Sequence, residues 1–101
     1  MMTERDVIRV EIDPELADIV PGYLEGRRNE LAVLRAALDS SDMESLRMLG
    51  HRMKGSGGGY GFEGISEIGL HLEQAARDGD LAASTAAVDA LESYLQRVVV
   101  V

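Results

Sequence analysis

The chain of 101 residues contains no cysteine, only two prolines and few aromatic residues, and it lacks a surplus of basic charge. Without cysteine, neither a disulfide framework nor a thiolate metal site can form, which suits a reducing compartment. Eighteen acidic residues against ten basic ones give a net charge of −8. That charge opposes binding to nucleic acid or to an anionic membrane surface. We therefore expect a protein partner and a cytoplasmic location.

Long apolar runs are also absent. None approaches the roughly 18 residues that span a bilayer, and the N-terminus has no basic segment followed by an apolar one. A chain of this length accommodates one modest hydrophobic core and no second catalytic lobe. We therefore predict a single domain over residues 1–101, with a short N-terminal arm over about 1–12.

The composition and the start of the chain favour helices. Aromatic residues are scarce, and both prolines lie before residue 22, which favours helices over sheets. Asp13-Pro14 predicts the start of a short helix, which ends at Val20 because Pro21 follows. A long amphipathic helix is then expected over 21–38.

Caps and apolar stripes indicate the remaining helices. Ser41 and Glu44 have the spacing of a capping box, and Gly79 and Asp80 are suited to end one helix and cap the next. Apolar residues recur at steps of three, four and seven: Leu24, Leu31, Leu34 and Leu38, then Phe62, Ile65, Ile68 and Leu72, then Leu81, Val88, Leu91 and Leu95. The predicted fold class is all-α, an antiparallel four-helix bundle with a short extra N-terminal helix. For Val98–Val101, a frayed helix end and an extended strand both remain open.

His51 lies on the helix that begins near Ser41. At about 100° per residue, Leu49 and Met53 fall on the side of the helix opposite His51. The helical wheel therefore predicts that His51 points away from the core. The residues within about 60° of His51 are Arg47, Met48, Lys54, Gly55 and Gly58.

Lys54 lies one turn after His51, and its ammonium can reach back toward the imidazole because helical side chains lean toward the N-terminus. There it would stabilise an anion attached to the ring, such as a phosphoryl group. Gly55 and Gly58 leave the same face bare for the close approach of a partner. Each interior helical glycine costs about 1 kcal/mol relative to alanine. The alternative is that the helix ends near Gly57 and the glycines form a loop.

This segment resembles the histidine-containing phosphotransfer (HPt) family. His51-Arg52-Met53-Lys54-Gly55-Ser56 fits that family's H-x-φ-K-G-S pattern, where φ is apolar, and Gly58, Tyr60-Gly61-Phe62 and Leu72-Glu73 follow. The resemblance extends more loosely over 14–95. It implies a four-helix bundle whose exposed histidine accepts a phosphoryl group from a receiver-domain aspartate or a kinase and passes it to another partner.

The resemblance also implies individual roles. His51 is the phosphoacceptor, Lys54 stabilises the phosphoryl group, and Gly55 leaves space for the receiver. The expected docking residues are Arg47, Met48, Gly55 and Gly58. The chain would be a phosphoryl carrier without kinase activity or a cofactor of its own. Magnesium and the acceptor aspartate would belong to the response-regulator receiver domain, with a sensor histidine kinase as a further partner.

Other features are less defined. Many HPt members have a glutamine near the histidine on the following helix, and this chain has His71, Glu73 and Gln74 in that region, with no role assigned. For Arg27 and Arg28 we expect ion pairs at the end of the bundle; the alternative is a positive potential toward a phosphorylated His51. Met1 and the compact length favour an independent protein over a domain of a hybrid kinase.

Two further classes of protein are alternatives. A non-catalytic helical adaptor would bind a signalling partner through the same face. A metal-binding bundle would use His51 and His71 with Glu67 or Glu73, although the outward position of His51 opposes it. Residues 59–64 match the G-x-G-x-x-G pattern of nucleotide-binding turns, but a helix rather than a strand precedes them. We therefore treat that match as accidental.

Overall fold

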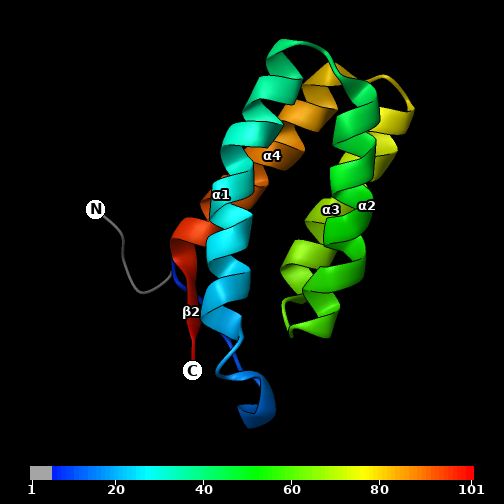
Figure 1. Cartoon of the computed structure of the whole chain (residues 1–101). Helices are drawn as coiled ribbons and strands as arrows, with labels where there is room; N and C mark the ends of the chain where they lie inside the picture. Colours follow the sequence, from blue (N-terminus) through cyan, green and yellow to red (C-terminus); the bar gives the residue numbers. More distant parts are fainter. Residues whose placement is uncertain (1–5) are drawn as a thin grey trace.

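Four helices form an antiparallel bundle in the computed structural model, which describes residues 6–101 (Figure 1). They are α1 (Val20–Asp39), α2 (Met43–Gly59), α3 (Glu63–Arg77) and α4 (Leu81–Arg97). Two short strands, β1 (Ile8–Val10) and β2 (Val98–Val100), and one 3-10 turn, η2 (Pro14–Leu16), complete the described chain. Consecutive helices run in opposite directions (Figure 1). The predicted all-α fold class is confirmed.

All four helices contribute to one hydrophobic core. Leu34 of α1, Leu46 of α2, Ile65 of α3 and Val88 of α4 are completely buried. Leu34, Ile65 and Val88 belong to the predicted stripes with helical spacing, which is why these helices each bury one face. Leu81 was expected in the core but is exposed, because it is the first residue of α4 and lies at the rim of the bundle.

The helices α2 and α3 pack backbone against backbone. A Cβ atom on Gly50 would lie 2.7 Å from the Glu73 amide nitrogen and 2.9 Å from the Gly69 carbonyl oxygen. A Cβ atom on Gly57 would lie 2.5 Å from the Ser66 amide nitrogen. No side chain fits at these positions. The glycines therefore allow the two helices to approach closely, and they bring residues 69–73 of α3 directly against residues 50–54 of α2.

The glycine run is helical, so the alternative in which α2 ends near Gly57 is wrong. The helix continues to Gly59. The Ser66 hydroxyl of α3 donates to the Lys54 carbonyl oxygen at 2.6 Å and accepts from the Gly58 amide at 2.9 Å. This hydroxyl joins the last turns of α2 to α3, which offsets part of the weak helix propensity of glycine.

The helix caps agree only in part with the sequence prediction. Asp42, rather than Ser41, caps α2, because its carboxylate accepts from the Ser45 amide at 3.1 Å. Ser41 has a φ of 53°, so the capping box does not form. Gly79 has a φ of 69° after α3, and Asp80 caps α4 by accepting from the Ala83 amide at 2.9 Å. These last two predictions are confirmed.

The extra N-terminal helix is shorter than predicted. It is the single turn η2, which Asp13 caps by accepting from the Glu15 amide at 2.9 Å. Val20 begins α1, and Pro21 lies in its first turn instead of ending the preceding helix. Proline is tolerated there because the first amides of a helix have no partner within the helix.

The chain ends form a small parallel sheet. Ile8 pairs with Val98 and Val10 with Val100, and the Val101 amide donates to the Val10 carbonyl at 3.0 Å. Of the two alternatives for the C-terminal valines, the extended strand is therefore the correct one. Part of the expected N-terminal arm is strand β1, while residues 1–5 of that arm lie outside the described residues.

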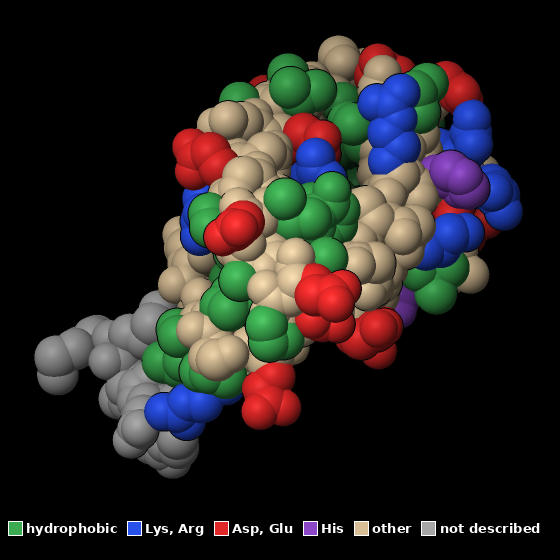
Figure 2. All heavy atoms as spheres, turned by 60° about the horizontal axis from the view of Figure 1, so that its bottom comes forward, with side chains coloured by type: hydrophobic (Ala, Val, Ile, Leu, Met, Phe, Trp, Pro, Cys, Tyr) green, Lys and Arg blue, Asp and Glu red, His purple; other side chains and the backbone are tan. Residues whose placement is uncertain are grey.

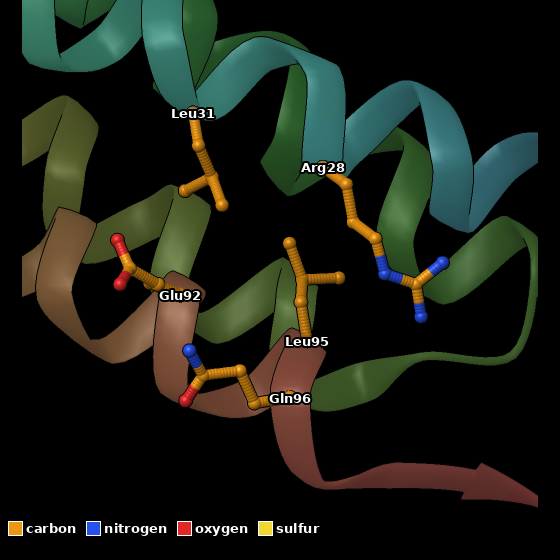
Figure 3. Close-up of a pocket in the computed structure, with 5 residues that line it drawn as sticks. All are labelled: Arg28, Leu31, Glu92, Leu95 and Gln96. Carbon is orange, nitrogen blue, oxygen red and sulfur yellow. The ribbon is translucent and has the colours of Figure 1, made fainter.

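A groove of about 340 Å³ lies between α1 and α4 (Figure 3). It is lined by Arg28, Leu31, Glu92, Leu95 and Gln96. Arg35 joins the same two helices through Asp89 at 2.7 Å and Glu92 at 2.9 Å. None of the lining residues belongs to α2 or α3, so the groove is separate from the helix pair that carries His51.

Arg27 and Arg28 form the kind of contact that was expected. Arg27 pairs with Glu30 at 2.8 Å and lies over the Tyr23 ring. Arg28 pairs with Glu25 at 3.8 Å. Both pairs are formed within α1, and the exposed pair of Arg28 contributes little to stability.

Gly50→Ala is expected to lower the free energy of unfolding by about 1–3 kcal/mol, the range for overpacking a tight contact. The added methyl group would force the backbones of α2 and α3 apart. Gly55→Ala is the matched control, because nothing lies within 4 Å of its Cβ position. It should stabilise α2 by up to about 1 kcal/mol. Urea unfolding measures both; a neutral Gly50→Ala would contradict the tight packing.

Candidate phosphotransfer site

His51 lies in the middle of α2, and its side chain is 63% exposed. Met53, predicted on the opposite side of the helix, is buried. The outward position of His51 is therefore confirmed. Figure 2 shows Lys and Arg side chains gathered around an exposed histidine on one side of the bundle.

Glu73 of α3 lies directly beneath His51. Its Oε2 atom is 2.8 Å from His51 Nδ1, and its side chain is only 4% exposed. The two helices bring these groups together because Gly50, one residue before His51, has no side chain to hold the Glu73 backbone away. The glycine contact therefore determines the position of the carboxylate.

Two cations, Lys54 and Arg77, also contact this carboxylate. Lys54 Nζ lies 2.8 Å from Glu73 Oε1, and Arg77 Nη2 lies 3.4 Å from Oε2. The Lys54 ammonium and, next, the His51 ring lower the pKa of Glu73 to about 2, while burial acts in the opposite direction. Glu73 is therefore ionised at neutral pH despite its burial.

The ionised carboxylate defines the tautomer of His51. A carboxylate can only accept a hydrogen bond, so Nδ1 carries the proton and donates a hydrogen bond to Glu73. The lone pair of a neutral imidazole then lies on Nε2. Because the side chain is largely exposed, Nε2 is available to a partner's reacting group. This arrangement can support nucleophilic attack without removal of a proton from the ring.

The close partner of Lys54 is a residue that the helical wheel did not indicate. The Lys54 ammonium is bonded to Glu73, which lies on the neighbouring helix and was not assigned a role from the sequence. Lys54 and His51 thus share one carboxylate. Lys54 remains close to the ring, and its role at a phosphoryl group stays a prediction.

The residues expected to bind a partner differ in their surroundings. Met48 is exposed, and Arg47 pairs with Glu44 at 2.6 Å. The Cβ position of Gly55 has nothing within 4 Å, whereas that of Gly58 lies 3.3 Å from Glu63 Oε1. Gly55 is therefore the barer of the two glycines, and Gly58 lies at the seam with α3. The docking roles of all four residues stay predictions.

The sequence left the polar residues of α3 unassigned. Of the three candidates, Glu73 reaches His51, while His71 and Gln74 are exposed on other parts of α3. Arg77 was not identified at all. Two signals were present: Glu73 follows Leu72 and lies one turn from the apolar Gly69 and Ala76, and Arg77 lies four residues after Glu73, a spacing that favours an ion pair.

The metal-binding alternative finds no support in the described part of the chain. Within residues 6–101, no group of three or more His, Cys, Asp or Glu side chains could hold a metal ion. His51 is bonded to Glu73, and His71 is exposed.

A family model described as "Hpt domain" matches residues 18–100. The chain therefore belongs to the Hpt domain family, whose members serve as phosphoryl carriers in two-component phosphorelays and interact there with receiver domains and kinases. No curated protein and no solved structure matches the chain. Over residues 6–101, none of the helices has both the length and the apolar character needed to cross a membrane.

Glu73→Gln should remove a pH-dependent contribution to stability. The pKa of Glu73 lies at about 2, below its ordinary value of 4.5, so the ionised contacts stabilise the fold above pH 4.5 and are lost as the pH falls toward 2. The difference in unfolding free energy between wild type and Glu73→Gln should shrink over that interval. Glu67→Gln, which changes an exposed glutamate of α3, is the control. A difference that stays constant with pH would contradict this assignment.

Proposed function

We propose that the protein is a cytoplasmic phosphoryl carrier in which His51 Nε2 accepts a phosphoryl group and exchanges it with a receiver-domain aspartate. The observation that carries the proposal is the 2.8 Å contact between His51 Nδ1 and the ionised Glu73. It supports the tautomer in which Nδ1 carries the hydrogen and the lone pair lies on Nε2, on the exposed side chain of His51. Membership of the Hpt domain family supports the same chemistry.

The proposed transfer needs no general base on this chain. The Nε2 lone pair forms the N–P bond while the bond between phosphorus and the oxygen of the aspartyl phosphate breaks. The bonding electrons leave with the aspartate as a carboxylate. Nε2 carries no proton before attack, so none has to be removed. The reverse sequence returns the group to an aspartate.

Glu73 stabilises positive charge on the imidazole, and Lys54 stabilises negative charge on the phosphoryl group. Positive charge develops on the imidazole as the N–P bond forms, and the Glu73 carboxylate at Nδ1 lowers its energy. Lys54 has three N–H donors. One holds Glu73, and another can be directed to a phosphoryl oxygen. Magnesium and the acceptor aspartate are supplied by the receiver in this proposal, and the chain contributes no cofactor.

The face around His51 suits an acidic partner. The chain has a net charge of −8, yet three basic residues, Arg47, Arg52 and Lys54, lie within four residues of His51 on α2. Arg77 of α3 contacts the same carboxylate, Glu73, as His51 does. Such a local concentration of basic side chains can orient a partner whose reacting group is an aspartate and whose magnesium ligands are carboxylates. We propose Met48 and Gly55 as the apolar and side-chain-free parts of the same docking surface.

His51→Gln should abolish acid-labile, base-stable phosphorylation by a phosphorylated receiver domain, because the accepting nitrogen is lost. His71→Gln is the matched control, since it removes the other histidine from an exposed position on α3 and should leave labelling intact. Autoradiography after acid and alkali treatment measures the label. Label that persists in His51→Gln, or that moves to serine, would sink the proposal.

The same variant separates a carrier from an adaptor. A carrier with His51→Gln should still bind the receiver but should no longer support signalling. A non-catalytic adaptor should keep both. Receiver binding by calorimetry and the signalling response in cells provide the two measurements.

Gly55→Leu should block the partner without blocking the chemistry. A leucine at this bare position projects into the space proposed for the receiver, so transfer from a receiver should slow by at least about tenfold. Phosphorylation of His51 by phosphoramidate, a small donor, should stay at the wild-type rate. Ala90→Leu on an exposed position of α4 is the control. Equal loss with both donors would contradict a docking role for Gly55.

A further inference from the structure

Glu73 holds its two basic partners with unequal strength. Lys54 Nζ is 2.8 Å from one carboxylate oxygen, and Arg77 Nη2 is 3.4 Å from the other. The Lys54 side chain is 40% exposed and that of Arg77 is 63% exposed. Lys54 therefore makes the close contact, while Arg77 is the more weakly held and the more accessible of the two.

The two cations approach His51 from opposite ends of the helix pair. Lys54 lies one turn C-terminal to His51 on α2, and Arg77 lies one turn C-terminal to Glu73 on α3. Because α2 and α3 are antiparallel (Figure 1), these positions lie on either side of the His51–Glu73 contact. Arg77 and the His51 ring share the same oxygen, Glu73 Oε2. The guanidinium and the ring thus contact the same oxygen atom before phosphorylation.

Phosphorylation changes the balance of charge at this contact. Before transfer, the Glu73 carboxylate is shared by Lys54, Arg77 and the His51 ring. A phosphoryl group adds about two negative charges to the ring that Glu73 contacts. The phosphoryl oxygens and the Glu73 carboxylate then both attract the Lys54 and Arg77 side chains, and the more weakly held of the two is the one that moves at the smaller cost.

The chemistry of the side chains favours the same assignment. A guanidinium presents paired N–H donors that fit two phosphoryl oxygens, whereas an ammonium acts as a point charge. If Lys54 left Glu73, the buried carboxylate would lose its closest cation. If Arg77 left, Lys54 and the His51 ring would still hold the carboxylate.

We propose that Arg77 is a phosphoryl-binding residue that moves from Glu73 Oε2 to the phosphoryl oxygens once His51 is phosphorylated, while Lys54 stays on Glu73. This inference rests on the proposed phosphorylation of His51. It gives Lys54 a second role, in which it positions the His51 ring through Glu73.

The direct test observes the guanidinium groups by ¹⁵N–¹H NMR before and after phosphorylation of the full chain with phosphoramidate. The Arg77 side-chain resonances should shift and their N–H exchange should slow on phosphorylation. Those of Arg52, an exposed arginine next to His51 in the sequence, should change little. Arg77 resonances that stay unchanged while His51 is phosphorylated overturn the inference.

A second test measures the ³¹P resonance of phosphorylated His51 in arginine variants. Arg77→Gln should shift the ³¹P resonance of phosphorylated His51, Arg77→Lys should restore it in part, and Arg52→Gln should leave it at the wild-type position. If Arg77 has a purely structural role, Arg77→Gln should leave the ³¹P resonance unchanged and should affect the protein equally with and without the phosphoryl group. That outcome would overturn the inference. Equal shifts in Arg77→Gln and Arg52→Gln overturn it as well, because they indicate only general positive potential.

The two proposals fail in different ways. If the chain takes no phosphoryl group, or if His51→Gln is still labelled, the proposed function and this inference fall together. If His51 is phosphorylated and the Arg77 signals do not respond, only the inference on Arg77 is lost.

Discussion

The close approach of α2 and α3 is the constraint on which the rest of the site depends. Gly50 and Gly69 remove the side chains that would separate the two backbones. Only at this separation can a glutamate of one helix lie beneath a histidine of the other and remain buried. The carboxylate then orders the imidazole, and Lys54 keeps the carboxylate ionised. Packing, tautomer and charge are thus consequences of the same contact.

The glycines of α2 have different functions despite their proximity in the sequence. Gly50 and Gly57 are buried against α3, where any side chain would collide with backbone. Gly55 lies on the outer surface with empty space around it. Glycine therefore allows close packing on the buried face of α2 and leaves space on its exposed face. The low helix propensity that results is offset by tertiary contacts, including the Ser66 hydroxyl at the end of α2.

Much of the fold could be predicted because its signals are local. Helical spacing of apolar residues locates the four helices, and the same geometry turns His51 outward while Met53 is buried. The failures have physical causes as well. Ser41 and Asp42 can each serve as a cap, and only the backbone conformation decides between them. Glu73 is a tertiary partner 22 positions from His51, and no periodicity within one helix reveals which residue of the next helix lies opposite.

The parallel pairing of β1 with β2 joins residues near the two ends of the described chain. Such a contact closes a very long loop, and its entropic cost is recovered only once the intervening helices have packed. A two-stranded sheet of three residues per strand has little stability of its own. The order of folding that follows is bundle first and sheet last. Opening then runs in reverse, so that the strands separate in small fluctuations that leave the helix pair around His51 intact.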